Sequence, residues 1–190
     1  YCTYTNKDIS SFFKNKLEYR KQIIPSWRYI ENGFNFNRIP YRNNMVIKGY
    51  LQTEKYFKEC KDLIYHYFEP NDILYNNIKN KYGELDLENK KVCSVHIRRG
   101  DYVNHRIHGV CDLDYYNRSM AYMKEKINID YFLIFSDDIE WGKKNVTGDN
   151  IKYSEGLIDL EDLFLMSLCD NHIISNSSFS WWGSWLCKKN

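Results

Sequence analysis

The chain has 190 residues and a mass of 23.0 kDa, which is enough for one large domain or two small ones with a buried core. Its 27 basic and 25 acidic side chains leave a formal net charge of +2, which argues against a broad positive surface for nucleic acid or an anionic membrane. Six cysteines without C-x-x-C spacing argue against a metal site and favour free thiols in a reducing compartment. There is no apolar run of about 18 residues and no signal-peptide pattern, so we expect no membrane anchor and, if the protein is microbial, a cytoplasmic location.

Residues 1–89 are predicted to form a partial and mostly helical region. Asn6 can cap a first helix. The apolar residues that repeat at helical spacing after it are Ile9, Phe12, Phe13 and Leu17. Residues 22–45 hold all but one of the prolines and predict a loop with room for a short strand, followed by a brief strand over 45–50.

Two more helices are predicted before the centre of the chain. Thr53 can cap the first of them, and Pro70 ends it. Asn71 can cap the second, and Gly83 stops it. Its inward-facing residues are Ile73, Leu74, Ile78 and Tyr82. The polar stretch that follows, 84–91, predicts a boundary between an N-terminal region over 1–89 and a second domain over 90–190.

The second domain is predicted to alternate strands and helices. Short apolar runs rich in β-branched and aromatic residues predict strands at Val92–Ile97, Tyr131–Ser136, Ile151–Tyr153 and 172–175. Helical spacing predicts helices at Leu113–Ile127, at 159–168 with Asp159 as its cap, and at 176–186 with Asn176, Ser177 and Ser178 as caps. The order β-α-β-α-β-α predicts a Rossmann-like parallel sheet with helices on its faces.

The stretch VCSVHIRRGDYV, residues 92–103, places two guanidinium groups, a glycine and a carboxylate directly after a buried strand. Open α/β sheets place their ligand loops at that point, which predicts an anion site at Arg98 and Arg99. Two alternatives stay open: a solvated sheet edge, and an adhesion tripeptide at Arg99, Gly100 and Asp101. The tripeptide reading is disfavoured because the preceding strand is expected to be buried.

Three loops are expected to meet at the carboxyl edge of this sheet. The first supplies His96, Arg98, Arg99 and Asp101; the second Ser136, Asp137 and Asp138; the third Asn176, Ser177, Ser178 and Ser180. Guanidinium forks and a helix N-terminus both bind phosphate, while carboxylates can accept N–H donors of guanine or hydroxyl groups of ribose. Together the loops predict a site for a nucleoside diphosphate.

Each prediction has an ordinary structural alternative. The two aspartates after the second strand can cap a following helix, whereas a divalent metal is disfavoured because the D-x-D spacing is missing. His96 at a strand end can be a hydrogen-bonded structural histidine. The tryptophans 181, 182 and 185 favour a core cluster over a sugar platform.

With these residues identified, the chain resembles the α-1,2-fucosyltransferases of glycosyltransferase family 11 over roughly residues 46–186. The resemblance rests on five ordered blocks: GYLQTEKYF at 49–57, HIRRGDYV at 96–103, HGVCDLDYY at 108–116, FLIFSDDIEW at 132–141, and DLFLMSLCDNHIISNSSFSWWGSWL at 162–186. It implies an inverting, metal-independent enzyme of the two-domain GT-B type that needs no cofactor. The implied reaction moves L-fucose from GDP-β-L-fucose to the 2-hydroxyl of a terminal galactose.

The resemblance also implies residue roles. Arg98 would contact the donor pyrophosphate with support from Arg99. The segment Ser136, Asp137 and Asp138 would bind the nucleoside end, and Ser177, Ser178 and Ser180 would lie near the phosphates. Asp101, Asp112 and Asp114 are all candidates for the proton acceptor.

One departure from the family concerns the N-terminal side. The Gly-rich stretch with which family members usually open is not found before Tyr1, so we expect the N-terminal domain to be truncated. The alternative function is a non-catalytic module that binds a GDP-sugar or a glycan. The sequence favours no particular oligomeric state.

Overall fold

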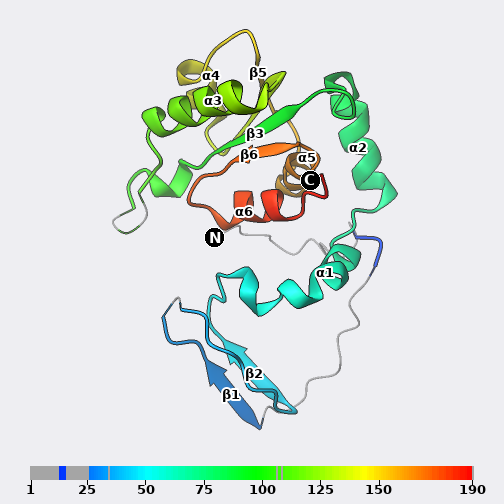
Figure 1. Ribbon diagram of the computed structural model, residues 1–190, viewed down its shortest axis with the longest axis vertical. Coiled ribbons are helices and arrows are strands. Elements are labelled where there is room, and N and C mark those ends of the chain that lie inside the picture. Colours follow the sequence, from blue (N-terminus) through cyan, green and yellow to red (C-terminus); the bar gives the residue numbers. More distant parts are fainter. Residues whose placement is uncertain (1–12, 16–25, 34, 106, 108, 190) are drawn as a thin grey trace. The chain divides into compact units, whose positions relative to one another are not determined.

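The structure is a computed structural model that describes residues 13–15, 26–33, 35–105, 107 and 109–189 (Figure 1). It divides into two compact units, Tyr1–Asn71 and Asp72–Asn190. Among the described residues, no helix combines the length and apolar character needed to cross a membrane. Of the predicted helix from Asn6, only residues 13–15 are described, and they are not helical, since Phe13 forms an antiparallel bridge with Pro70.

The first unit contains a pair of parallel strands, β1 (Trp27–Ile30) and β2 (Met45–Lys48). The short strand expected within the proline-containing loop is thus found, and β2 ends two residues before the predicted limit. Thr53 caps as predicted, since its side chain accepts from the backbone N–H of Lys55. The helix after it is broken into η2 (Glu54–Tyr56), η3 (Lys58–Cys60) and α1 (Lys61–Tyr67), because Phe57 leaves the helical backbone region at φ −141° and ψ 3°.

The two units divide between Asn71 and Asp72, whereas the polar stretch predicted a boundary at 89–90. The difference comes from α2 (Asp72–Tyr82), which buries Leu74, Ile78 and Tyr82. The Tyr82 hydroxyl also donates to the carbonyl of Glu155 at 3.0 Å. These contacts fix α2 within the sheet-containing unit, and the short η4 (Gly83–Leu85) then leads toward the sheet.

The second unit is built on a four-stranded parallel sheet with the order β5-β4-β3-β6. Its strands are β3 (Val92–Ile97), β4 (Tyr131–Ser136), β5 (Ile151–Tyr153) and β6 (Asn171–Ile173), so the first three match the prediction. β6 ends before 175, because the Ile174 carbonyl accepts the Tyr115 hydroxyl at 2.6 Å and the Ser175 hydroxyl bonds to His96 at 2.8 Å. The predicted Rossmann-like α/β class is confirmed.

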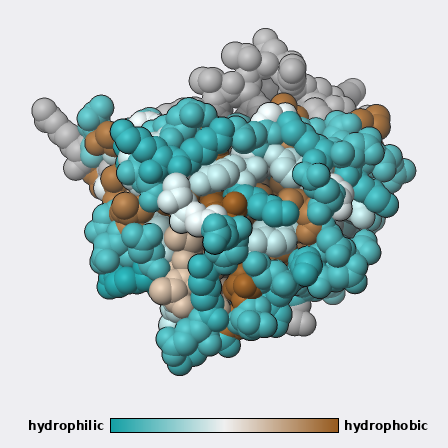
Figure 2. All heavy atoms as spheres, turned by 90° about the horizontal axis from the view of Figure 1, so that it is seen from above, coloured by the Kyte–Doolittle hydropathy of each residue, from teal (hydrophilic) through white to brown (hydrophobic). Residues whose placement is uncertain are grey.

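Helices cover both faces of this sheet. α3 (Leu113–Ile127) and α4 (Ile139–Asn145) lie on one side in Figure 1, and α5 (Asp159–Ser167) and α6 (Ser178–Trp185) pack together on the other. The core between the sheet and α3 includes Val95, Tyr116 and Phe132, each with 0% exposure. On the face seen in Figure 2, hydrophilic side chains predominate and apolar ones are scattered among them.

The structure has one helix more than predicted and a different start for another. α4 follows the Asp-Asp pair as a separate helix of seven residues, too short to give a clear apolar period. α5 is capped by Ile158 rather than Asp159, and the Glu161 side chain accepts from the Ile158 backbone N–H at 3.0 Å. Asp159 is the first residue of the helix, where a carboxylate still interacts favourably with the helix dipole.

The strand order creates a topological switch point between β3 and β6. The chain leaves β3 toward α3 on one face of the sheet and leaves β6 toward α6 on the other. Adjacent parallel strands whose connections diverge in this way leave a crevice at their carboxyl ends, where α/β proteins bind ligands. The first and third of the predicted loops flank this point.

Candidate functional site

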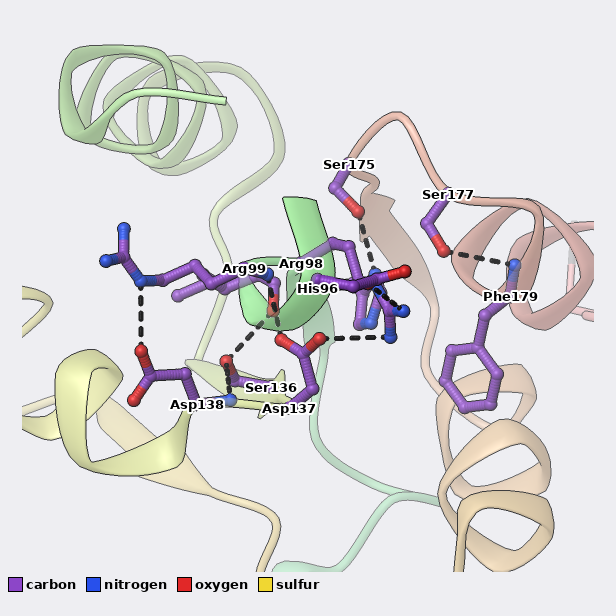
Figure 3. Close-up of polar contacts among 11 residues, drawn as sticks. His96, Arg98, Arg99, Ser136, Asp137, Asp138, Ser175, Ser177 and Phe179 are labelled. Atoms are coloured by element: carbon purple, nitrogen blue, oxygen red, sulfur yellow. Dashed lines mark hydrogen bonds and ion pairs between the residues drawn. The ribbon is translucent and has the colours of Figure 1, made fainter. Parts of the chain in front are cut away.

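Arg98 is held by carboxylates from two different loops, of which Figure 3 shows the one from Asp137. Its Nη1 lies 3.0 Å from Asp137 Oδ2, and its Nη2 donates to Asp101 Oδ1 at 2.6 Å. Its guanidinium carbon also lies 5.2 Å from the centroid of the Tyr102 ring, within the short helix η5 (Gly100–Tyr102). The Arg98 side chain is 25% exposed, so the fork is fixed in place while part of it still faces solvent.

Arg99 is fixed by a different set of groups. Its Nε donates to Asp138 Oδ2 at 3.1 Å, and its guanidinium carbon lies 4.1 Å from the centre of the Trp141 ring. Asp138 Oδ1 also accepts from the Trp141 backbone N–H at 3.2 Å and so caps α4. The capping alternative is therefore found for Asp138, and the same carboxylate anchors Arg99.

Ser136 joins the ends of the two central strands. Its hydroxyl donates to the Ile97 carbonyl at 2.9 Å and accepts from the Asp138 backbone N–H at 3.0 Å. Ile97 and Ser136 are also register partners in the sheet. This last residue pair of β3 and β4 thus sets the position of Asp137 and Asp138 relative to the arginines.

His96 connects the arginine loop to the loop after β6. Its Nδ1 lies 2.8 Å from the Ser175 hydroxyl, and its ring centroid is 5.3 Å from that of Phe179. Burial, together with the positive charge of Arg98, lowers the pKa of His96 to about 4, so the ring is neutral at pH 7. The structural role considered for this histidine is therefore present, and it lies at the β3–β6 crevice.

The third loop supplies the N-terminus of α6. Ser177 caps this helix by accepting from the Phe179 backbone N–H at 3.3 Å, and Ser178 is exposed at its first position. Ser180 is fully buried, and its hydroxyl donates to the Ser177 carbonyl at 3.2 Å, which directs it into the helix turn. Asn176 is exposed and donates to the Gly109 carbonyl at 2.6 Å. Ser177 and Ser178 are thus the serines of this loop that stand at the helix start.

The three candidate proton acceptors lie in different surroundings. Asp101 belongs to the arginine cluster; desolvation raises its pKa, but the charge and hydrogen bond of Arg98 outweigh this and the net shift is downward. Asp112 caps α3 by accepting from the Tyr115 backbone N–H at 2.7 Å. Asp114 pairs with Arg118 one turn along α3 at 2.8 Å, and both side chains are largely exposed. Only Asp101 of the three is an ion-pair partner of Arg98 in the described part of the chain.

Three supporting residues were not identified from the sequence. Ser175 holds His96, while Tyr102 and Trp141 lie against the two guanidinium groups. The spacing of Trp141, three residues after a potential cap, could have indicated its role. The described residues contain no group of three or more histidine, cysteine or acidic side chains that could hold a metal ion.

An open parallel sheet with a charged cluster at the carboxyl end of its central strands defines a ligand-binding domain of the doubly wound α/β class. Comparison of sequences gives the particular family: the model of glycosyl transferase family 11 matches residues 6–190, so the chain belongs to this family of glycosyltransferases.

Curated relatives agree with this assignment. An alpha-1,2-colitosyltransferase of Escherichia coli is 44% identical over 73% of this chain and 50% of its own length. The O-antigen biosynthesis glycosyltransferase WbnK of Escherichia coli is 32% identical over 88% and 58%. A galactoside 2-alpha-L-fucosyltransferase of Caenorhabditis elegans is 30% identical over 76% and 43%. The chain thus spans about half the length of the curated relatives it matches.

A solved structure, POFUT1 in complex with GDP, has a similar fold. It matches with a TM-score of 0.53 at 13% identity and covers 77% of this chain and 53% of that one. At this identity the likeness concerns the fold alone. It agrees with the GT-B type of α/β fold that the sequence resemblance implied.

Proposed function

We propose that this chain carries the nucleotide-sugar side of an inverting, metal-independent fucosyltransferase. The reaction would move L-fucose from GDP-β-L-fucose to the 2-hydroxyl of a terminal galactose in a glycan. The observation that best supports this proposal is the position of the Arg98 guanidinium, which is held at the carboxyl end of β3 next to the β3–β6 crevice. Membership of glycosyl transferase family 11 supports the reaction class.

Arg98 is proposed to bind the β-phosphate of the donor. As GDP leaves an oxocarbenium-like fucosyl centre, negative charge grows on that phosphate, and a fixed guanidinium stabilises it more in the transition state than in the ground state. Ser177, Ser178 and the N-terminal N–H groups of α6 would bind the remaining phosphate oxygens. Arg99 keeps the supporting role that the resemblance implied, since its guanidinium lies against the Trp141 ring of α4 and pairs with Asp138.

The nucleoside role considered for Asp137 and Asp138 remains part of this proposal. Their pattern in the sequence showed no basic neighbour, but folding brings the arginines from 38 and 39 positions away to both carboxylates. All four oxygens already accept hydrogen bonds or take part in ion pairs. Each oxygen keeps a second lone pair, and the two side chains are 25% and 40% exposed, so both carboxylates could accept from guanine or ribose while they hold the arginines.

The colitosyltransferase relative supports a second candidate for the donor. It is 44% identical to this chain, and its name shares the alpha-1,2 linkage but not the sugar. A donor that carries colitose instead of fucose would leave the proposed diphosphate chemistry unchanged. The two donors can be distinguished only by assaying both.

The proposed function is tested by assaying the chain with GDP-fucose and GDP-colitose on a panel of galactose-terminated acceptors, with EDTA present. We expect transfer from one of these donors and an α-1,2 linkage in the product by NMR. GDP binding by calorimetry without transfer would instead favour the non-catalytic binding module. Transfer that needs an added divalent metal would contradict the metal-independent mechanism.

Replacing Asp101 with asparagine should tighten GDP binding about three- to tenfold. The site contains three carboxylates, Asp101, Asp137 and Asp138, and only two guanidinium groups, Arg98 and Arg99. Asp101 is the most exposed of the three carboxylates, at 52%, so its removal relieves repulsion of the diphosphate at the least structural cost. Calorimetry with GDP at about 0.15 M salt measures the effect, and unchanged or weaker binding would contradict it.

A further inference from the structure

We propose that Asp137 is a positioning residue that aims Arg98 at the leaving diphosphate, an inference that rests on the proposed function. Its two carboxylate oxygens act on neighbouring parts of the arginine loop. Oδ1 accepts from the Arg99 backbone N–H at 2.8 Å, and Oδ2 pairs with Nη1 of Arg98 at 3.0 Å. One carboxylate thereby fixes both the main chain of the loop and the guanidinium that the reaction would use.

Gly100 is the residue that makes room for this carboxylate. A Cβ atom built on Gly100 would lie 2.5 Å from Asp137 Oδ2 and 3.3 Å from its Cγ. Real Cβ atoms do not approach an oxygen so closely, so any larger residue would displace the carboxylate. The glycine after the two arginines is thus explained by the close approach of Asp137 to the backbone of the loop.

The sheet fixes where Asp137 stands. The preceding residue, Ser136, is the register partner of Ile97 and donates its hydroxyl to the Ile97 carbonyl at 2.9 Å. Asp137 therefore follows directly after the last paired residue of β4, opposite the start of the arginine loop. A side chain that directly follows a buried pair of hydrogen-bonded strands moves less than one on an exposed turn.

The other carboxylate on Arg98 is placed differently. Asp101 lies on the same loop as Arg98, three residues on, and its side chain is 52% exposed against 25% for Asp137. Figure 3 shows Asp137 reaching Arg98 from the second loop. Asp137 is thus the partner that ties the arginine to the rigid sheet, while Asp101 moves together with the loop.

This arrangement has a catalytic consequence. A free arginine side chain carries about 2 kcal/mol of rotamer entropy, and a donor that must be ordered during the reaction stabilises the transition state less. Asp137→Asn keeps the shape and the acceptor for Arg99, but turns an N–H donor toward Nη1 of Arg98. We expect kcat to fall about tenfold or more, and GDP affinity to stay within threefold or increase, because a negative charge has been removed near the diphosphate.

The matched control is Asp130→Asn. Asp130 makes a similar bridge at the opposite edge of the same strand pair, where its Oδ2 accepts from the Lys91 backbone N–H at 2.8 Å and its Oδ1 lies 3.5 Å from Lys90 Nζ. This variant makes the same chemical change far from the arginines. We expect its kcat to stay within twofold of the wild type.

Two readouts separate positioning from a merely structural role. Asp137→Asn lowers kcat by some factor in the wild type. In an Arg98→Ala background this factor should be at least fivefold smaller, because both changes act through one guanidinium. The second readout is the exchange of the Arg98 Nη protons with water, measured by ¹⁵N NMR. The Arg98 signals are identified by their loss in Arg98→Lys. Their exchange should be at least fivefold faster in Asp137→Asn than in Asp130→Asn.

The outcomes also separate this inference from the proposed function. A wild-type chain that binds GDP but transfers no sugar overturns the proposed function; the NMR comparison then still decides whether Asp137 holds Arg98. If the wild type transfers and Asp137→Asn keeps kcat within threefold, or if Arg98 exchange is unchanged, the positioning role is overturned.

Discussion

Replacing Arg98 with alanine should lower transfer by about 100- to 1,000-fold, the range observed when one preorganised donor is removed from a developing oxyanion. The physical reason is that the guanidinium is held by Asp101 and Asp137 before any donor arrives, so no reorganisation is needed as charge grows on the phosphate. The measurement is kcat/KM with GDP-fucose, combined with GDP affinity by calorimetry. Affinity should fall less than kcat, because the interaction strengthens on the way to the transition state.

A cation elsewhere on the same unit provides the control. Lys152 on β5 lies with its Nζ 4.6 Å from the Tyr131 ring, much as Arg98 lies over Tyr102. Lys152→Ala should leave kcat/KM within about twofold, and both variants should melt within a few degrees of the wild type, because neither side chain belongs to the buried core. An Arg98→Ala variant with more than a tenth of wild-type turnover would refute the role proposed for this residue.

The sequence was sufficient to predict the central strands and the main helix. Val92–Ile97 and Tyr131–Ser136 are buried on both faces, so they appear as continuous apolar runs with charged or polar limits. Leu113–Ile127 has a regular apolar stripe and a carboxylate cap at Asp112. Each of these elements is defined by a local pattern, and all three have the predicted bounds.

The contacts within the site depend on long-range register, which a single sequence does not reveal. Asp137 meets Arg98 only because Ile97 pairs with Ser136, and a one-residue slip would turn each side chain to the opposite face. Likewise, β6 ends early because Ser175 bonds to a histidine 79 positions away. Sequence reasoning thus identified which loops meet, whereas the pairing of their charges required the structure.

Acidification from pH 7 to pH 4.5 should destabilise the sheet-containing unit by about 3 kcal/mol. Burial lowers the pKa of both His96 and His172 from 6.5 to about 4, so the unfolded state binds more protons than the folded state below pH 6.5. The free energy of unfolding therefore falls as the pH is lowered through this window, by about 2.5 kcal/mol for each histidine. Asp162 acts in the opposite direction. Burial raises its pKa from 3.8 to about 6, so it regains about 2 kcal/mol as the pH falls below 6.

Variants separate these opposing contributions. His172 lies 2.8 Å from the Ser94 hydroxyl through Nδ1, and its buried Nε2 has no hydrogen-bond partner among the described residues. Protonation therefore buries a positive charge whose desolvation outweighs the attraction of Asp170. His172→Gln should therefore lose clearly less stability than the wild type over the same interval, and Asp162→Asn clearly more. Urea unfolding followed by tryptophan fluorescence measures each difference, since four of the five tryptophans lie in this unit. Equal pH dependence in all three proteins would show that neither His172 nor Asp162 changes its pKa on folding.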